Sequence, residues 1–178
     1  LDEGNLSCIA DLGLHELYIT PPHAHDEMLA QLANLTELHG LDLSGTDITD
    51  EGLAHLSGLV WLQLLNLEET AVTDAGIVHL AGLTHLRELE LAHTSVTDAS
   101  METLGGLVNL RKLNLRRTAV TDEGLVSLGT LEDLWILNLE WTDVTDEGLV
   151  HLDTLTQLRE LSLGANCITD EGLENVSV

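Results

Sequence analysis

The chain has little positive charge. Six Lys and Arg residues stand against 31 Asp and Glu residues, which gives the 178-residue sequence a formal net charge of −25. Such a chain repels phosphate groups, so we expect neither general nucleic-acid binding nor attachment to anionic membrane surfaces. The charge favours solubility and a protein partner that carries a basic patch.

Aromatic residues and long apolar runs are also scarce. Phe is absent, and the only aromatic residues besides histidine are Tyr18, Trp61, Trp135 and Trp141. No stretch approaches the roughly 20 apolar residues that cross a bilayer, and no signal-peptide pattern is present. Because the chain begins with Leu1 rather than Met, a longer parent protein is one interpretation, and the compartment stays unknown on this ground.

Only two cysteines are present, Cys8 and Cys167, near opposite ends of the chain. If the chain forms stacked units with strands about 4.8 Å apart, some six units separate these residues. A disulfide needs Cα atoms within about 7 Å, so the two cannot pair within one chain. Two unpaired thiols lean towards a reducing compartment such as the cytoplasm.

The dominant feature of the sequence is a repeat of 24 residues. Each unit follows the pattern L-x-x-L-x-x-L-x-L-x-x-T-x-V-T-D-x-G-L-x-x-L. Its first leucine recurs at Leu35, Leu59, Leu83, Leu107, Leu131 and Leu155. A fixed period of this length predicts stacked supersecondary units rather than one closed core.

Each unit has two halves with different periodicity. The first half, as in Leu113-Asn114-Leu115, alternates apolar and variable residues and predicts a short strand. The second half, as in 122–128, spaces its apolar residues as a short helix does. Strands joined by helical crossovers predict one parallel sheet of about seven strands, wound right-handedly, in an α/β fold.

The repeats define the expected domain organisation. We expect a single domain over residues 1–178, with about seven repeats in 12–178, the last of them incomplete. Residues 1–11 are expected to form an N-terminal cap or a partial repeat. Because the sequence stops within a unit, we expect either further chain or another molecule to cover the last core edge.

The pattern resembles the leucine-rich repeat family over residues 12–178. Its second half, T-A-V-T-D-E-G-L in 118–125, is similar to the cysteine-containing subclass of F-box substrate receptors and of many bacterial repeat proteins. The family's Asn or Cys ladder position holds Thr in five units and Asn166 in the last. A Thr hydroxyl can bond backbone groups there, with fewer bonds than Asn offers. The resemblance implies a curved solenoid with a concave parallel sheet, short helices on the convex side, and protein recognition on the concave face.

Repeated Asp and His residues suggest a metal site, but a simpler interpretation fits them better. An Asp precedes each helical run, where it can cap free amides and interact with the helix dipole. His55, His79 and His151 share one column, yet neighbouring helices lie too far apart for a common Zn²⁺ ion. We therefore predict no metal site and no cofactor, with His23, His25 and Asp26 as at most an adventitious site.

No catalytic motif is found. The sequence has no Gly-rich phosphate loop, no nucleophile elbow, and no Cys and His pair with an orienting third group. We therefore expect a protein without enzymatic activity.

The variable positions of the strands predict the binding site. Four of the six basic residues fall in one unit, and the next unit adds Ile136 and Trp141. Arg and Trp are the residues that most often carry interface energy. Ion pairing of the arginines with neighbouring glutamates is the alternative explanation. The predicted partner-binding residues are Arg116, Arg117, Glu140, Trp141 and Ile136 at the centre, Lys112, Glu88, Glu90, Asn114 and Asn138 around them, and Glu68 and Glu69 as an acidic flank.

These observations favour a non-catalytic module that binds a protein or peptide on its concave face. One alternative is a structural or assembly spacer of a larger protein, which would self-associate through uncapped ends. Another is the substrate-recognition part of a ubiquitin ligase or of a bacterial effector, which would require further domains.

Overall fold

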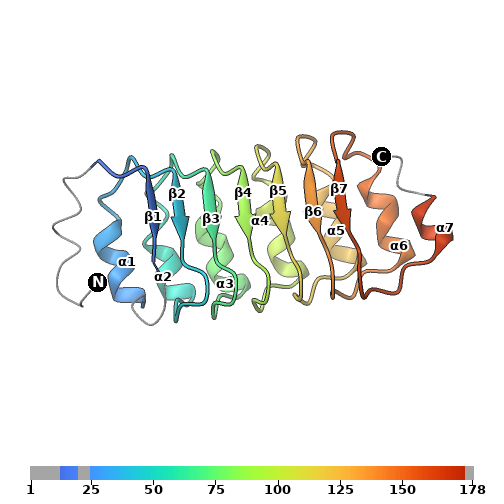
Figure 1. The fold of residues 1–178 in the computed structure, drawn as a ribbon, viewed down its shortest axis with the longest axis horizontal. Coiled ribbons are helices and arrows are strands. Elements are labelled where there is room, and N and C mark those ends of the chain that lie inside the picture. The colour runs from blue at the N-terminus through green and yellow to red at the C-terminus, as the bar shows by residue number, and fades with distance from the viewer. Residues whose placement is uncertain (1–12, 20–24, 175–178) are drawn as a thin grey trace.

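The computed structural model describes residues 13–19 and 25–174, and they form a stack of repeats with one sheet (Figure 1). The sheet has seven parallel strands in the order β1 to β7, and the helices lie behind it. The predicted α/β solenoid is therefore confirmed. The predicted cap in 1–11, Cys8 and His23 lie outside the described residues. No helix of the described part has the length and apolar character that a bilayer crossing requires.

Every strand is three residues long, and the helical segments span three to seven residues. The strands are β1 (Glu16–Tyr18), β2 (Gly40–Asp42), β3 (Leu64–Asn66), β4 (Glu88–Glu90), β5 (Lys112–Asn114), β6 (Ile136–Asn138) and β7 (Glu160–Ser162). The α-helices are α1 (Asp26–Leu32), α2 (Asp50–Ala54), α3 (Asp74–Ile77), α4 (Met101–Gly105), α5 (Asp122–Leu128), α6 (Asp146–Leu149) and α7 (Asp170–Leu173). The 3₁₀ helices are η3 (Val78–Leu80), η4 (Asp98–Ser100) and η5 (Val150–Leu152).

The strand register follows the repeat of the sequence. Leu89 lies opposite Leu65 on one side and Leu113 on the other, so residues 24 positions apart are direct neighbours in the sheet. The leucine at the centre of each strand points inward, and Leu41 to Leu137 in this column are fully buried. The residues on either side of it point outward. Together with the turn that follows each strand, they form what we call the strand face. Any column of the strand face can therefore be assigned from the sequence.

The core consists of aliphatic side chains between the sheet and the helices. The columns that begin at Ile48 and Leu53 are buried through Val144 and Leu149. Burying such side chains contributes about 1.5 to 3 kcal/mol each, which stabilises the stack despite its very short helices. Leu173 is 50% exposed because no described repeat packs against its outer side.

The recurring Asp residues link neighbouring repeats. The Asp26 carboxylate accepts hydrogen bonds from the backbone N–H of Thr49, at 2.9 Å, and from its hydroxyl, at 2.6 Å. The same pair of bonds recurs through Asp146 and Thr169. We call this contact the Asp–Thr link. It lowers the pKa of Asp146, because the Thr169 hydroxyl and amide both donate to the carboxylate.

The prediction that these Asp residues cap their own helices was wrong. The N-cap of α5 is Thr121, whose hydroxyl accepts a hydrogen bond from the Glu123 amide at 3.3 Å. Asp122 is the first residue of the helix and points to the next repeat. The threonine that receives the Asp–Thr link is thereby also the cap, so one residue fixes both the helix start and the spacing between repeats.

The Asp–Thr link explains the glycine of the repeat. A Cβ atom on Gly148 would lie 2.3 Å from Asp122 Oδ1, closer than non-bonded atoms allow. Ser100 is the exception, since its hydroxyl donates a short hydrogen bond to Asp74 instead. Burial would raise the pKa of Asp74, but the hydrogen bonds from Ser100 and Thr97 outweigh it and hold that pKa below its usual value.

The ladder position bonds as expected. The Thr118 hydroxyl donates to the carbonyl of Leu115 at 2.7 Å, and the equivalent threonines do the same. Asn166 makes two bonds to the preceding repeat, from its amide to Leu139 O and from Thr142 N–H to its oxygen. The threonine therefore holds its own turn, whereas Asn166 also joins two repeats.

Candidate functional site

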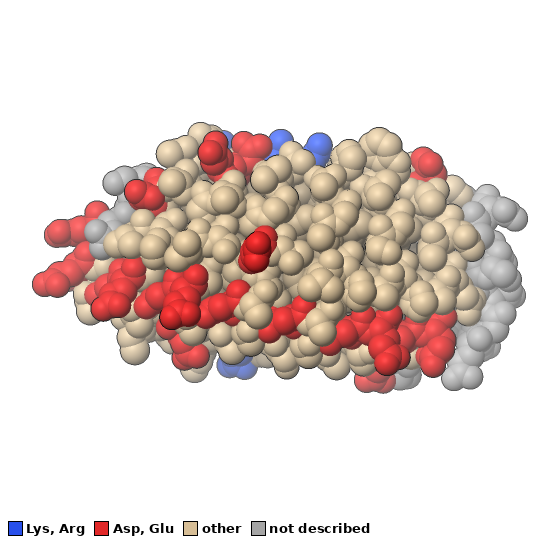
Figure 2. All heavy atoms as spheres, turned by 180° about the vertical axis from the view of Figure 1, so that it is seen from behind, with Lys and Arg blue, Asp and Glu red and all other residues tan. Residues whose placement is uncertain are grey.

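The two faces of the stack differ in charge. Figure 2 shows the helical side, where Asp and Glu form a long band and Lys and Arg are visible only at the upper and lower margins. All six basic residues lie within a strand or within three residues of one: Arg87, Arg111, Lys112, Arg116, Arg117 and Arg159. The scarce cations of an acidic protein are thus collected around the sheet.

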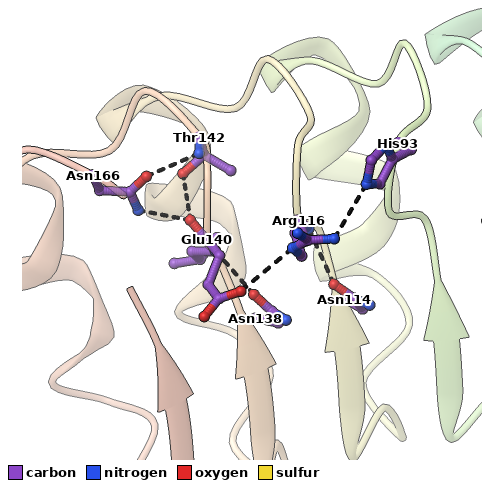
Figure 3. Close-up of polar contacts among 8 residues, drawn as sticks. His93, Asn114, Arg116, Asn138, Glu140, Thr142 and Asn166 are labelled. Carbon is purple, nitrogen blue, oxygen red and sulfur yellow. Dashed lines mark hydrogen bonds and ion pairs between the residues drawn. The ribbon is translucent and has the colours of Figure 1, made fainter. Parts of the chain in front are cut away.

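A polar network occupies the strand face after β5 and β6 (Figure 3). Arg116 Nε lies 3.4 Å from Glu140 Oε2, and its Nη1 lies 3.2 Å from the His93 ring. Asn114 accepts a hydrogen bond from the Arg116 amide, and Asn138 accepts one from the Glu140 amide, at 3.1 and 2.9 Å. The two asparagines therefore hold the backbone from which the charged side chains project.

A second ion pair lies nearer the start of the strands. Lys112 Nζ is 2.6 Å from Glu90 Oε1 on the neighbouring strand. The hydrogen bond that the Lys112 ammonium donates to Glu90 raises the pKa of Lys112 above its usual value, and the charges of Glu90, Glu88 and Glu160 add to the effect. The charge of Lys112 is consequently neutralised within the chain. Ion pairing of the arginines, the alternative raised from the sequence, is correct for Arg116, whereas Arg117 has no carboxylate within 4.0 Å among the described residues.

The turn that follows each strand has an unusual backbone. Glu69, His93, Arg117, Trp141 and Ala165 occupy the same position and have φ between 55° and 60°, in the left-handed region. A residue with a Cβ atom is strained there by about 1 kcal/mol, and glycine would avoid that cost. Only Gly45 follows this preference in the column. We call these six positions the trailing turn.

Arg117 and Trp141 contact each other in the trailing turn. The Arg117 guanidinium carbon lies 5.0 Å from the centre of the Trp141 ring, within the range of a cation–π interaction. The Trp141 side chain is nevertheless 54% exposed, so most of the indole surface remains available to a partner. The structure thus brings together Arg116, Arg117, Glu140 and Trp141, four of the five residues of the predicted centre. The fifth, Ile136, lines a groove that the other four do not line.

A groove on the strand face lies apart from these four residues. It has a volume of about 530 Å³ and runs over the first halves of the strands. Ile136, Lys112 and Glu88 from the predicted site line it, whereas Arg116, Arg117 and Trp141 are absent from its lining. Glu68 and Glu69 line a separate hollow of about 260 Å³ with Ser44 and Gly45. The predicted residues therefore divide between a groove and the turns beyond it.

Two family models described as leucine rich repeat match this chain. One covers residues 62–120, and the other covers 32–57, 134–152 and 154–177. The chain belongs to the leucine-rich repeat family. The resemblance noted in the sequence is therefore confirmed.

Solved structures of internalins share the fold. An internalin from Listeria monocytogenes aligns with a TM-score of 0.72 at 25% identity, over 97% of this chain and 55% of its own. Internalin C2 from the same bacterium aligns with a TM-score of 0.69 at 27% identity, over 92% of this chain and 77% of its own. This chain thus spans little more than half of the first structure. A comparison with curated protein sequences gives no match.

One arrangement of side chains on these leucine-rich repeats was missed in the sequence. Trp135, just before β6, lies between two arginines, with Arg111 4.7 Å and Arg159 4.6 Å from the centre of its ring. The residues just before each strand, which we call the leading edge, are His15, His39, Gln63, Arg87, Arg111, Trp135 and Arg159. Their 24-residue spacing was enough to predict that they lie side by side, because the strand register pairs residues 24 positions apart.

One cluster on the leucine-rich repeats has the composition of metal ligands. Glu68, Glu69 and His93 each place a ligand atom within 4.8 Å of the others. No metal site was predicted from the sequence, and His55, His79 and His151 form no such cluster among the described residues. Arg116 lies 3.2 Å from the His93 ring, and its positive charge opposes a cation there.

Proposed function

We propose that the strand face of this chain recognises a segment of another protein and that it does so without catalysing a reaction. Membership of the leucine-rich repeat family supports a protein-binding role. The internalin structures support the same rigid scaffold. Backbone hydrogen bonds connect each strand to the next, so the side chains are held ready and little ordering entropy is lost on binding.

The exposed Trp141 carries the proposal. Its side chain adds nothing to the buried core, and its backbone occupies a conformation that favours glycine. A tryptophan in this environment costs stability, which is typical of a side chain kept for contact with a partner. Arg117 stacks on one part of the indole and limits its rotation.

The surrounding residues have distinct roles in this proposal. Arg116 and Glu140 offer a fixed ion pair next to Trp141, and Ile136 adds an apolar surface in the groove. Lys112 and Glu90 form the second fixed pair, with Glu88 beside it. Asn114 and Asn138 hold the strand ends, and Glu68 and Glu69 provide an acidic flank for basic groups of the partner.

A titration with selected peptides tests the site. Peptides would be selected from a random display library against the whole chain, and their dissociation constants measured by fluorescence anisotropy. We expect Trp141→Ala to weaken binding by about 2 kcal/mol, which is about 30-fold, because a central aromatic contact is lost.

Val126→Ala is the matched control. Val126 is 57% exposed on α5, on the helical side, so this change should leave affinity within about twofold. Circular dichroism would establish that each variant is folded. Unchanged affinity in folded Trp141→Ala, or an equal loss in Val126→Ala, would contradict the proposed site.

The assembly alternative rests on apolar residues of the helical side. Val78, Val126 and Val150 occupy one column and are each exposed by 44 to 57%. Association through this column would produce oligomers without any ligand. Sedimentation of the wild-type chain and of Val126→Asp distinguishes the two functions. A wild-type oligomer that dissociates in the Val126→Asp variant favours assembly, and a monomeric wild-type chain favours recognition.

A further inference from the structure

The arginines of the leading edge form no ion pair within the described part of the chain. Lys112 and Arg116 pair with Glu90 and Glu140, at 2.6 and 3.4 Å. In contrast, Arg87, Arg111 and Arg159 have no carboxylate within 4.0 Å among residues 13–19 and 25–174. Arg117 also lacks a carboxylate within that distance among the described residues, but it stands alone in the trailing turn, over Trp141. The leading edge therefore gathers three of the four unpaired guanidinium groups of this acidic chain.

Backbone bonds place these arginines in one row. The Arg111 amide donates to Arg87 O, the Trp135 amide to Arg111 O, and the Arg159 amide to Trp135 O, each at 2.8 Å. Arg111 comes one repeat before Trp135 and Arg159 one repeat after it, and both guanidinium groups lie over its ring. Stacking on an indole limits the motion of a guanidinium group while its N–H edge stays free for a carboxylate.

Open space borders the row on two sides. Arg87, Arg111 and Trp135 line the groove of about 530 Å³, whose lining also includes the apolar Leu64 and Ile136. Arg87 and Arg111 also line a hollow of about 300 Å³ with His85, Asn109 and Asp133. A peptide on the leading edge can therefore reach the arginines and place an apolar side chain in the groove.

The net charge of the protein does not prevent an acidic ligand from binding there. At physiological ionic strength the Debye length is about 8 Å, so exposed carboxylates farther away are largely screened. Glu16 and Glu88 line the groove and Asp133 the smaller hollow. Glu16 lies on β1, three strands from Arg87 at about 4.8 Å per strand, so Glu88 and Asp133 are the two negative charges that remain close. Arg87 and Arg111 line the same two hollows, and Arg159 lies over Trp135 at the end of the row, so three guanidinium groups stand against these two carboxylates.

We propose that the leading edge binds an acidic peptide segment of the partner. Carboxylates of that segment bind Arg87, Arg111 and Arg159, and an apolar side chain packs on Trp135 and Ile136. This inference rests on the proposed function and narrows the class of partner. Acidic groups of the partner bind the leading edge, and its basic groups bind Glu68 and Glu69.

Three labelled peptides of ten residues test the inference. Each alternates leucine with one polar residue, which is Glu, Gln or Lys, and fluorescence anisotropy measures binding to the whole chain at about 0.15 M salt. We expect the Glu peptide to bind at least tenfold more tightly than the Gln peptide. A preference for the Lys or Gln peptide, or no binding of the Glu peptide at 1 mM chain, would overturn the inference.

Two double variants with the same charge change locate the site. Arg111→Gln with Arg159→Gln should weaken binding of the Glu peptide at least tenfold. Val126→Glu with Val150→Glu, at exposed positions of the helical side, lowers the net charge equally and should change binding less than threefold. Equal losses in the two variants would contradict binding at the leading edge. A labelled oligothymidine of ten nucleotides that binds as tightly as the Glu peptide would also overturn the acidic-peptide assignment. The arginines of the leading edge would then bind phosphate groups as well as they bind carboxylates.

The library-selected peptides of the preceding section separate the two proposals. If they bind while the Glu peptide does not, the acidic partner class is wrong and the recognition function stands. If neither binds to folded chain, both proposals fail.

Discussion

The turns that carry the Asp–Thr links, which we call the helical-side turns, differ from the strand face in how much their residues vary from repeat to repeat. At the helical-side turns the same Thr, Asp and Gly recur, and the Asp of one repeat contacts the Thr and the Gly of the next. On the strand face the trailing turn holds Glu69, His93, Arg117 and Trp141 at one position, in a backbone conformation that suits none of them well. Uniform residues therefore maintain the stack, and variable residues remain available for binding.

The largest effect is expected where the repeat is strict. Gly148→Ala places a Cβ about 2.3 Å from Asp122 Oδ1 and 3.0 Å from its Cα, so the Asp–Thr link to Thr145 must shift. We expect a loss of about 2 to 3 kcal/mol in the free energy of unfolding, measured by urea denaturation.

Gly58→Ala is the matched control, because nothing lies within 4 Å of its added Cβ. It should change stability by less than about 0.5 kcal/mol. Equal effects of the two substitutions would show that the Asp–Thr link tolerates a side chain at this glycine.

Acid should weaken the helical-side turns. The pKa values of Asp74 and Asp146 are lowered in the folded chain, so the unfolded chain binds more protons as the pH falls below about 4. Their stabilising effect is present above the unfolded pKa and is lost as the pH falls through the lower, folded value. Each carboxylate is expected to contribute less to the free energy of unfolding than Gly148→Ala removes, because solvent screens an accessible carboxylate.

Urea midpoints at pH 7, 5 and 3 measure this dependence. Asp74→Asn removes one titrating group, so the fall in stability between pH 5 and pH 3 should be smaller in that variant than in the wild type. An identical fall in both proteins would exclude Asp74 as a source of the acid sensitivity.

The smallest effect is expected in the trailing turn. Glu69 is exposed and has a φ of 56°, so Glu69→Gly relieves strain while Glu69→Ala retains it. We expect the glycine variant to be more stable than the alanine variant by about 1 kcal/mol, with the wild type close to the latter. Thermal unfolding of the three proteins checks the order, and a less stable glycine variant would argue against strain at this position.

The repeat predicted the strands and the core correctly because both depend on local periodicity. Leu41, Leu65 and Leu89 mark strand centres, and each is fully buried. The role of Asp50 was predicted wrongly, since capping rules consider only the residues that follow along the chain. Its carboxylate bonds Thr73, 23 residues later, and that contact depends on how closely the repeats stack.

The candidate site was predicted in part for a similar reason. The proximity of Arg116 and Glu140 follows from the register. The groove depends instead on the size of neighbouring side chains, such as Gly40 beside Leu64, and no motif encodes it. Trp135 between Arg111 and Arg159 could have been found by comparing columns at 24-residue intervals.

The Asp–Thr link also bears on how such a chain can change length. Each 24-residue unit carries both the acceptor for the following unit and the donors for the preceding one. An in-frame duplication of one unit would therefore keep every junction matched, and the array could lengthen without new compensating substitutions. The same duplication placed between Trp135 and Arg159 would move that arginine one position farther from the indole, so growth of the scaffold can remodel its ligand preference in a single event.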